Sequence, residues 1–191
     1  MKVNNRNITG EQITLMTDEE LIRGCIKGKE SYQYEVYRRY SPKMFGVCLR
    51  YCASREEAED VLQDGFIKVF KKMDTFRFSG SFEGWIRKIM VNTAIRNKYT
   101  HFRSHETNTL EGVEHPVTDE KITSDLSVAD LMKLINELPQ GYKIVFNMFA
   151  IEGYSHKEIA ETLNIQEATS RSQYLRARQF LREKLEKIET K

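Results

Sequence analysis

The sequence predicts an all-α protein with two helical domains, an N-terminal helix bundle and a C-terminal helix-turn-helix, joined by a flexible acidic linker. Its periodic segments place apolar residues at helical spacing rather than in alternation. The 191 residues include only 3 prolines and 10 glycines, which are few for a protein of many short strands and turns. Residues 104–126 lack periodicity and separate the helical segments into two groups, which predicts a linker at this position.

In the first predicted domain, residues 15–103, capping boxes mark the starts of two helices. In each box a hydroxyl, Thr17 or Ser54, is followed three residues later by a glutamate, a pattern typical of helix N-termini. The segment between these helices, from about residue 30 to 51, is also helical in pattern and contains Pro42. This proline marks either a new helix start or a kink.

A loop rich in aromatic and small residues, 74–81, precedes the last helix of this domain. One face of that helix is predicted to be buried, because its residues recur at i, i+3, i+4, i+7 and i+11: Phe82, Trp85, Ile86, Ile89 and Thr93. The opposite face presents Lys88, Asn92, Arg96 and Tyr99. Because Trp85 lies on the apolar face, we expect it in the core rather than on a base-stacking surface.

The second predicted domain, residues 127–191, begins at Ser127 with a helix whose expected core face is Leu131, Leu134, Ile135 and Leu138. A second helix opens at Pro139, and its nearly continuous apolar run predicts burial on most sides. A third capping box at Ser155 then begins a short helix to Leu163.

That short helix, a three-residue turn and a long helix from about Glu167 form a helix-turn-helix pattern. Ala160 is small where the two helices must cross closely, and the long helix opens with short polar residues and arginines suited to base edges and phosphates. Two positions depart from the usual pattern. Asn164 stands where the turn usually has glycine, and Ser170 stands where a buried aliphatic residue is common.

Charge is distributed unevenly, although the formal net charge is only +2. Residues 84–103 carry five basic side chains and no acidic one, and residues 168–184 carry five against one. Between these blocks, residues 104–130 carry seven acids and one lysine. Because solvated helix faces usually mix both signs, the two basic blocks predict two separate surfaces for polyanions.

Several classes of protein are disfavoured by composition. No window approaches the roughly 18 uninterrupted apolar residues of a membrane span, and the first ten residues lack the apolar core of a signal peptide. The three cysteines lack CxxC spacing, and His101, His105 and His115 are spread over a flexible stretch, so we expect no disulfide framework, no metal and no cofactor. The lack of a membrane span, a signal peptide and a disulfide framework predicts a cytoplasmic location. No Walker loop or placed Ser/His/Asp set is present, so we expect a protein that is not an enzyme.

Taken together, these segments resemble the sigma-70 family of RNA polymerase sigma factors, in particular its extracytoplasmic-function (ECF) subgroup. In the first domain the resemblance is carried by AEDVLQDGFIKVF at 58–70 and FEGWIRKIMVNTA at 82–94. In the second it is carried by ELP at 137–139, GYSHKEIA at 153–160 and RAR at 176–178. It covers roughly residues 15–190, and the order of helix bundle, linker and helix-turn-helix without a third domain is the ECF arrangement.

The resemblance implies a bacterial transcription initiation factor that binds core RNA polymerase, recognises the −10 and −35 promoter elements and promotes DNA melting. The residues implied to bind the clamp helices of the largest catalytic subunit are Asp60, Gln63, Asp64 and Phe66. Those implied to bind −10 DNA are Phe78, Ser79, Gly80, Lys88, Asn92 and Arg96. Those implied to bind −35 DNA are Thr169, Arg171, Ser172, Arg176 and Arg178.

Some alternatives stay open at this point. The chain could be a helix-turn-helix regulator that does not bind core polymerase and whose first domain senses a signal or dimerises. A nucleic-acid enzyme is disfavoured, because the acids at 56–60 have solvent-facing helical spacing rather than the clustering that metal ions need. The acidic linker either enters the RNA exit route of the polymerase or acts as a solubilising spacer. An anti-sigma factor is a usual partner in the family, although no residue indicates one.

Overall fold

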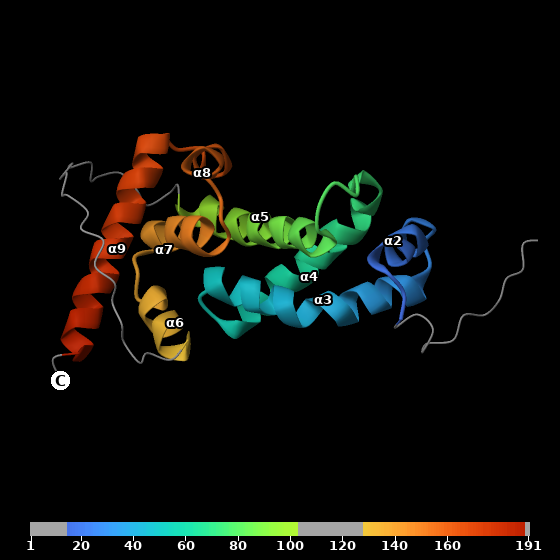
Figure 1. Cartoon of the computed structure of the whole chain (residues 1–191), viewed down its shortest axis with the longest axis horizontal. Helices are drawn as coiled ribbons and strands as arrows, with labels where there is room; N and C mark the ends of the chain where they lie inside the picture. The colour runs from blue at the N-terminus through green and yellow to red at the C-terminus, as the bar shows by residue number, and fades with distance from the viewer. Residues whose placement is uncertain (1–14, 103–127, 190–191) are drawn as a thin grey trace, which may run out of the picture. The chain divides into compact units, whose positions relative to one another are not determined.

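The structure, a computed structural model, describes residues 15–102 and 128–189 (Figure 1). All secondary-structure elements in these two ranges are helical and neither range contains a strand, which confirms the all-α class. The chain divides into two compact units between Arg96 and Asn97, and each is described by itself below. The predicted linker 104–126 and the predicted cap at Ser127 lie outside the described residues.

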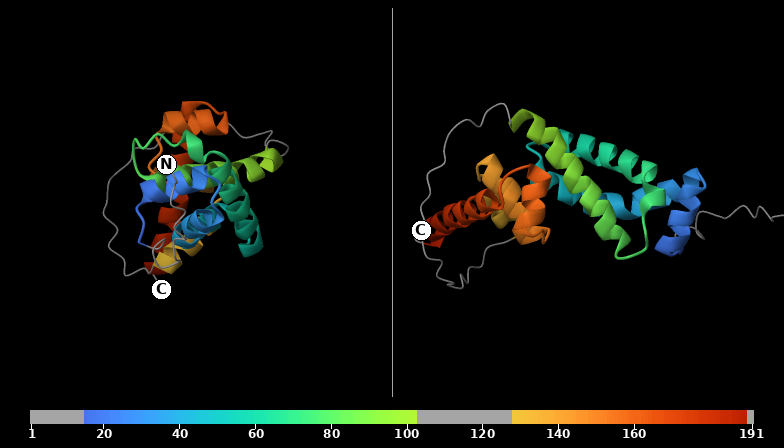
Figure 2. Two further views of the ribbon diagram at one scale, coloured as in Figure 1. Left: turned by 90° about the vertical axis from the view of Figure 1, so that its right-hand side faces the viewer. Right: turned by 90° about the horizontal axis from the view of Figure 1, so that it is seen from above.

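The first unit is built from α2 (Asp18–Ile26), α3 (Glu30–Tyr51), α4 (Arg55–Lys71) and the part of α5 (Phe82–Phe102) up to Arg96, with a short 3₁₀ turn, η1 (Met73–Thr75). Helices α3 and α4 lie side by side, and α5 packs against both (Figures 1 and 2). Fully buried side chains from all three of these helices form the core: Val36, Met44, Val47, Cys48, Ala58, Val61, Val69, Ile86, Met90 and Val91.

Two of the three predicted capping boxes are complete. Thr17 and Ser155 each accept a hydrogen bond from the backbone N–H three residues on, and the glutamate there returns one. At Ser54 only half of the box forms. The Ser54 hydroxyl accepts from the Glu57 N–H at 3.2 Å, but the Glu57 carboxylate accepts from the N–H of Ala53 at 2.7 Å. The Glu57 carboxylate therefore accepts from the N–H of Ala53 instead of the N–H of Ser54 that a complete box would use.

Helix α3 is continuous through Pro42, so the proline does not start a new helix. Near the beginning of α3, the buried carboxylate of Glu35 accepts hydrogen bonds from Arg38 at 2.8 and 2.9 Å, and Arg39 lies 3.4 Å away. These bonds, those of Arg38 first, lower the pKa of Glu35 although burial opposes them. Arg39 and Tyr40 also bind Asp18, at 3.2 and 2.6 Å, which ties α2 to α3.

The second unit consists of α6 (Val128–Asn136), α7 (Gln140–Phe146), a π-helical turn η2 (Asn147–Ile151), α8 (His156–Leu163) and α9 (Glu167–Glu189) (Figure 1). Its main core cluster is Leu134, Ile135, Leu138, Ala177 and Leu181. Leu131, predicted on the same face, is 42% exposed, so this prediction was wrong. The apolar run is also less buried than predicted, because Ile144, Val145 and Met148 lie inside while Ile151 is exposed.

A close approach of α2 to α3 yields the first testable prediction. A Cβ added at Gly24 would lie 2.0 Å from a ring carbon of Tyr32, whereas one added at Gly46 in α3 meets nothing within 4 Å. We expect Gly24→Ala to lower the free energy of unfolding by about 1–3 kcal/mol through overpacking. We expect Gly46→Ala to raise it by up to about 1 kcal/mol, because alanine favours the helix.

Urea unfolding followed by the fluorescence of Trp85, the single tryptophan of the chain, reports on this unit alone. If the Gly24→Ala and Gly46→Ala proteins unfold at the same urea concentration, the close approach described here is wrong.

Candidate functional site

Helix α4 buries one face and presents a polar stripe on the other. Asp60, Gln63 and Asp64 are all exposed on this stripe. Phe66 does not share that exposure: it is 3% exposed, and its ring packs 4.8 Å from the ring of Tyr37 in α3. The polar residues predicted to bind polymerase therefore lie together on the surface, whereas Phe66 supports the stripe from inside.

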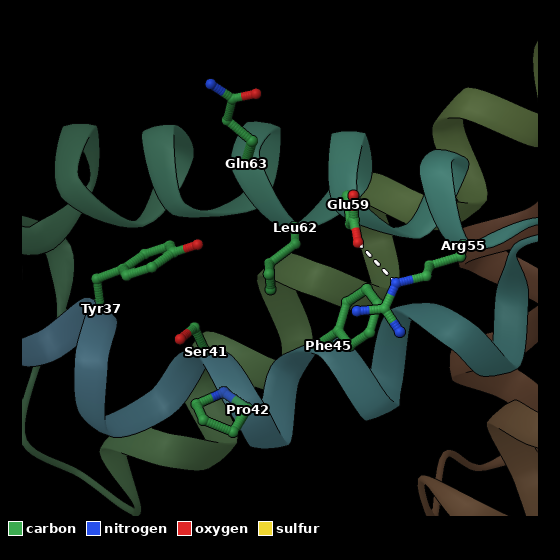
Figure 3. A pocket seen from close by; sticks show the side chains of 8 residues that line it. All are labelled: Tyr37, Ser41, Pro42, Phe45, Arg55, Glu59, Leu62 and Gln63. Carbon is green, nitrogen blue, oxygen red and sulfur yellow. Dashed lines mark hydrogen bonds and ion pairs between the residues drawn. The ribbon is translucent and has the colours of Figure 1, made fainter.

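A pocket of about 620 Å³ lies between α3 and α4 beside this stripe (Figure 3). The Arg55 guanidinium stacks over the Phe45 ring at 4.9 Å and pairs with Glu59 at 2.9 Å, which closes one end of the pocket. Leu62 projects between the two helices, and Gln63 points away from the α3 side chains (Figure 3). This face of the unit therefore combines a pocket of mixed apolar and polar lining with the exposed stripe of Asp60, Gln63 and Asp64.

Helix α5 presents the predicted basic face. Lys88, Asn92 and Arg96 recur at every fourth residue and are exposed, as the periodicity predicts. The side chain of Tyr99 lies outside the described residues. On the opposite side, Thr93 is buried and its hydroxyl accepts a hydrogen bond from Lys68 of α4 at 3.2 Å.

The loop before α5 exposes the other residues predicted to bind −10 DNA: Phe78, Ser79 and Gly80. Phe78 is 49% exposed and has φ of +56°, a left-handed conformation that a bulky residue rarely adopts. Gly80 has φ of +138°, which only glycine adopts without strain. The loop therefore turns sharply on both sides of Ser79 and projects the Phe78 ring outward.

An aromatic cluster anchors this loop to the start of α5. The Phe76 ring lies 5.3 Å from Phe82 and 5.5 Å from Trp85, and Phe82 stacks on Trp85 at 5.8 Å. Phe78 joins the edge of the cluster through Phe76, at 5.1 Å. Trp85 packs against Phe76 and Phe82 but is only half-buried, so it lies at the edge of the core rather than inside it as predicted.

Glu83, at the start of α5, was not among the residues predicted to have a role. Glu83 accepts a hydrogen bond from Lys43 of α3 at 2.7 Å and from Arg87 at 3.1 Å. These two cations, Lys43 first, lower the pKa of Glu83 although burial opposes them. Arg87 is therefore engaged with Glu83, whereas Lys88 and Arg96 are exposed on the predicted basic face.

The helix-turn-helix prediction is confirmed in α8 and α9. Asn164 adopts the left-handed conformation that a glycine would otherwise supply, with φ of 51° and ψ of 48°. Ile159 and Leu163 are buried at the crossing of the two helices, together with the small Ala160.

The residues of α9 predicted to bind −35 DNA differ in how exposed they are. Arg171 and Ser172 are exposed, and Arg171 pairs with Glu167 one turn earlier. Thr169, Arg176 and Arg178 are half-buried. The Arg176 guanidinium donates a hydrogen bond to the Tyr142 hydroxyl of α7 at 3.3 Å, so this arginine also supports packing.

Ser170, the departure from the usual pattern, is fully buried and has a polar partner. Its Oγ lies 2.9 Å from Nδ1 of His156 at the start of α8. His156 was not identified from the sequence, because its partner is 14 residues away in another helix. The presence of a serine at a normally aliphatic buried position was the only signal.

The described residues contain no group of three or more His, Cys, Asp or Glu side chains that could hold a metal ion. Within the same residues, none of the helices has the length and apolar character needed to cross a membrane.

Each unit matches a known protein family. The model of the family described as Sigma-70 region 2 matches residues 36–106, and that of Sigma-70, region 4 matches residues 129–181. The ECF RNA polymerase sigma-E factor of Haemophilus influenzae is 28% identical over 188 residues, covering 91% of this chain and 97% of the relative. The ECF RNA polymerase sigma factor SigE of Mycolicibacterium smegmatis is 30% identical over 158 residues, covering 80% of this chain and 61% of the relative.

Solved structures share the fold. The sigma factor RpoE, in complex with the anti-sigma factor NepR from Bartonella quintana, matches with a TM-score of 0.51 and 21% identity, covering 80% of this chain and 96% of that one. CnrH, in complex with the cytosolic domain of CnrY, matches with a TM-score of 0.51 and 20% identity, covering 88% and 97%. A region 2 unit followed by a region 4 unit is the architecture of a sigma factor. The chain belongs to the ECF group of the sigma-70 family.

The setting of His156 makes its titration testable. Burial lowers the pKa of His156 below 6.5, the Arg171 cation acts in the same direction, and Glu167 opposes them. Because the unfolded chain then binds more protons below pH 6.5, the stability contribution of His156 is complete above pH 6.5 and is lost as pH falls through the folded-state pKa.

We expect Arg171→Ala to raise the pKa of His156 and Glu167→Gln to lower it further, as measured by an NMR pH titration of the His156 ring in the full chain. A His156 pKa at or above the ordinary value in the wild type would contradict the buried setting described here.

Proposed function

We propose that this sigma factor, an initiation factor that binds core RNA polymerase, divides its work among three surfaces. The exposed stripe of α4 docks on the polymerase, the loop before α5 and the basic face of α5 open and hold the −10 element, and α9 reads the −35 element. The observation that carries this proposal is the placement of three sets of exposed polar side chains on helices whose opposite faces are buried. The role is non-catalytic and belongs in the cytoplasm, where the polymerase and promoter DNA meet.

The stripe of α4 suits a partner with cationic and polar side chains. Asp60 and Asp64 lie one helical turn apart with Gln63 between them, so all three can contact the same partner helix. The neighbouring pocket offers apolar area for a side chain of that partner. Because the acidic stripe repels DNA, this face suits a protein partner rather than the promoter.

The loop and α5 suit DNA that has been opened. Melting a duplex without ATP requires that unpaired bases be trapped, by stacking and by hydrogen bonds beside a cationic groove. The exposed ring of Phe78 offers a stacking surface, and the Asn92 amide offers both a donor and an acceptor for a base edge. Lys88 and Arg96 lie one turn to either side of Asn92 and supply charge for the neighbouring phosphates.

Helix α9 suits duplex DNA. Thr169, Arg171 and Ser172 lie in its first turns, the part of a recognition helix that contacts base edges in the major groove. The half-buried Arg176 and Arg178 lie further along and suit phosphates, which position the helix.

A regulatory partner is part of this proposal. The two solved structures of similar fold are complexes, one with the anti-sigma factor NepR and one with the cytosolic domain of CnrY. By this analogy we propose an anti-sigma factor as a partner of this chain, alongside core polymerase and promoter DNA, with no membrane insertion of the chain itself.

The docking surface is tested by the double substitution of Asp60 and Gln63 with alanine. We expect core affinity to fall roughly thirtyfold, because interface hot spots cost about 2 kcal/mol or more. Affinity for purified core is measured by fluorescence anisotropy of the labelled full chain, and circular dichroism should not change because both side chains are exposed. Glu161→Ala, an exposed acid of α8, is the matched control and should bind core normally. Unaltered affinity in the double variant would remove α4 from the interface.

The opening surface is tested by Asn92→Ala in reconstituted holoenzyme. We expect closed-complex formation near the wild-type level and a reduced yield of open complex, measured by permanganate reactivity in the −10 element. A premelted bubble should restore much of the yield if Asn92 assists opening, and little if it holds the captured base. Gln179→Ala, an exposed amide of α9, is the control. A wild-type yield of open complex on duplex DNA contradicts a role for Asn92.

A further inference from the structure

The strongest unassigned feature of the second unit is the polar pair between α8 and α9. Ser170 has no exposed surface, and its Oγ lies 2.9 Å from Nδ1 of His156. A buried hydroxyl that lacks a partner costs free energy, so the serine holds its place in this core through the histidine. The bond is directional, unlike the aliphatic contact that this position usually makes.

The imidazole is itself held in place from several sides. Its ring stacks on Phe149 at a centroid distance of 4.2 Å and an interplanar angle of 13°, and Tyr174 of α9 lies 5.8 Å away. His156 is also the first residue of α8 and lies inside the capping box that Ser155 and Glu158 form. The histidine is therefore a fixed point from which a hydrogen bond can orient α9.

The side chain that receives this bond stands between two residues of the proposed −35 surface. Thr169 and Arg171 flank Ser170, and successive side chains on a helix are about 100° apart. Any rotation of α9 that moves Ser170 away from His156 therefore turns Thr169 and Arg171 by the same angle. The bond restricts that rotation in the first turns of α9, where base contacts are made.

We propose that His156 is a positioning residue for −35 recognition, which acts through Ser170 to fix the rotation of the first turns of α9. The inference rests on the proposed function of α9 and deepens it, because it names what holds the reading side chains in register. It assigns His156 to sequence discrimination rather than to DNA contact.

The test separates the hydrogen bond from the ring stacking. His156→Phe keeps an aromatic ring against Phe149 but removes Nδ1, whereas His156→Asn loses the ring but keeps a polar atom near the position of Nδ1. Ser170→Ala removes the bond from the other side with the smallest change of shape. Ile135→Val, in the core cluster of α6, is a control that lowers stability by about 0.5–1.5 kcal/mol without touching the pair.

The probe is the duplex that wild-type holoenzyme selects from a pool randomised upstream of a fixed −10 element, compared with a scrambled duplex. For His156→Phe and Ser170→Ala we expect the affinity ratio of the two duplexes to fall about fivefold to tenfold, the size of one buried hydrogen bond. We expect His156→Asn to keep most of the ratio and Ile135→Val to keep all of it.

Wild-type discrimination by both His156→Phe and Ser170→Ala would overturn this inference while leaving the proposed function intact. An equal loss in Ile135→Val would also overturn it, since stability alone would then explain the effect. If the wild-type holoenzyme selects no upstream sequence, the proposed function of α9 fails and this inference fails with it.

Discussion

The arrangement of the first unit depends on the buried contact that α4 and α5 make at Gly65 and Met90. A Cβ at Gly65 would lie 2.2 Å from the sulfur of Met90, so the end of the Met90 side chain packs directly over the Gly65 backbone and would have to move for any larger residue. Gln63 lies two residues before Gly65, and Asn92 lies two residues after Met90. Each is therefore about 200° around its helix from the contact residue. The same contact that builds the core therefore turns the polar stripe of α4 and the basic face of α5 outward, where each can meet a different partner.

In the second unit, helix packing likewise sets which faces are exposed, and a buried hydrogen bond contributes to it. Ala160 and Ile159 allow α8 to cross α9 closely, and the bond from His156 to Ser170 fixes α9 at that crossing. In both units the buried contacts are made by one face of a helix and most of the proposed binding residues belong to the other, although Arg176 also donates a hydrogen bond to Tyr142. Stability and function therefore reside largely in different residues, which allows binding variants to be made without unfolding the chain.

Local sequence signals predicted most of the helices and the exposed faces. Capping residues, periodicity and the turn at Asn164 depend on neighbours within a few positions, so the sequence alone reveals them. The errors and omissions arose where distant residues decide. Leu131 fits the apolar spacing but lies exposed, and His156 gains its meaning only from Ser170. The packing of Phe66 on Tyr37 also depends on a distant residue, and its role at the polymerase interface stays a prediction.

The central claim is that three outward faces meet three different partners during initiation. Photoreactive side chains placed singly at Gln63, Asn92 and Ser172 in reconstituted open complexes test it most directly. The account predicts that the probe at Gln63 cross-links to the largest catalytic subunits, the probe at Asn92 to −10 DNA, and the probe at Ser172 to −35 DNA. Cross-linking of the Gln63 probe to DNA, or of the Asn92 probe to protein alone, would contradict it.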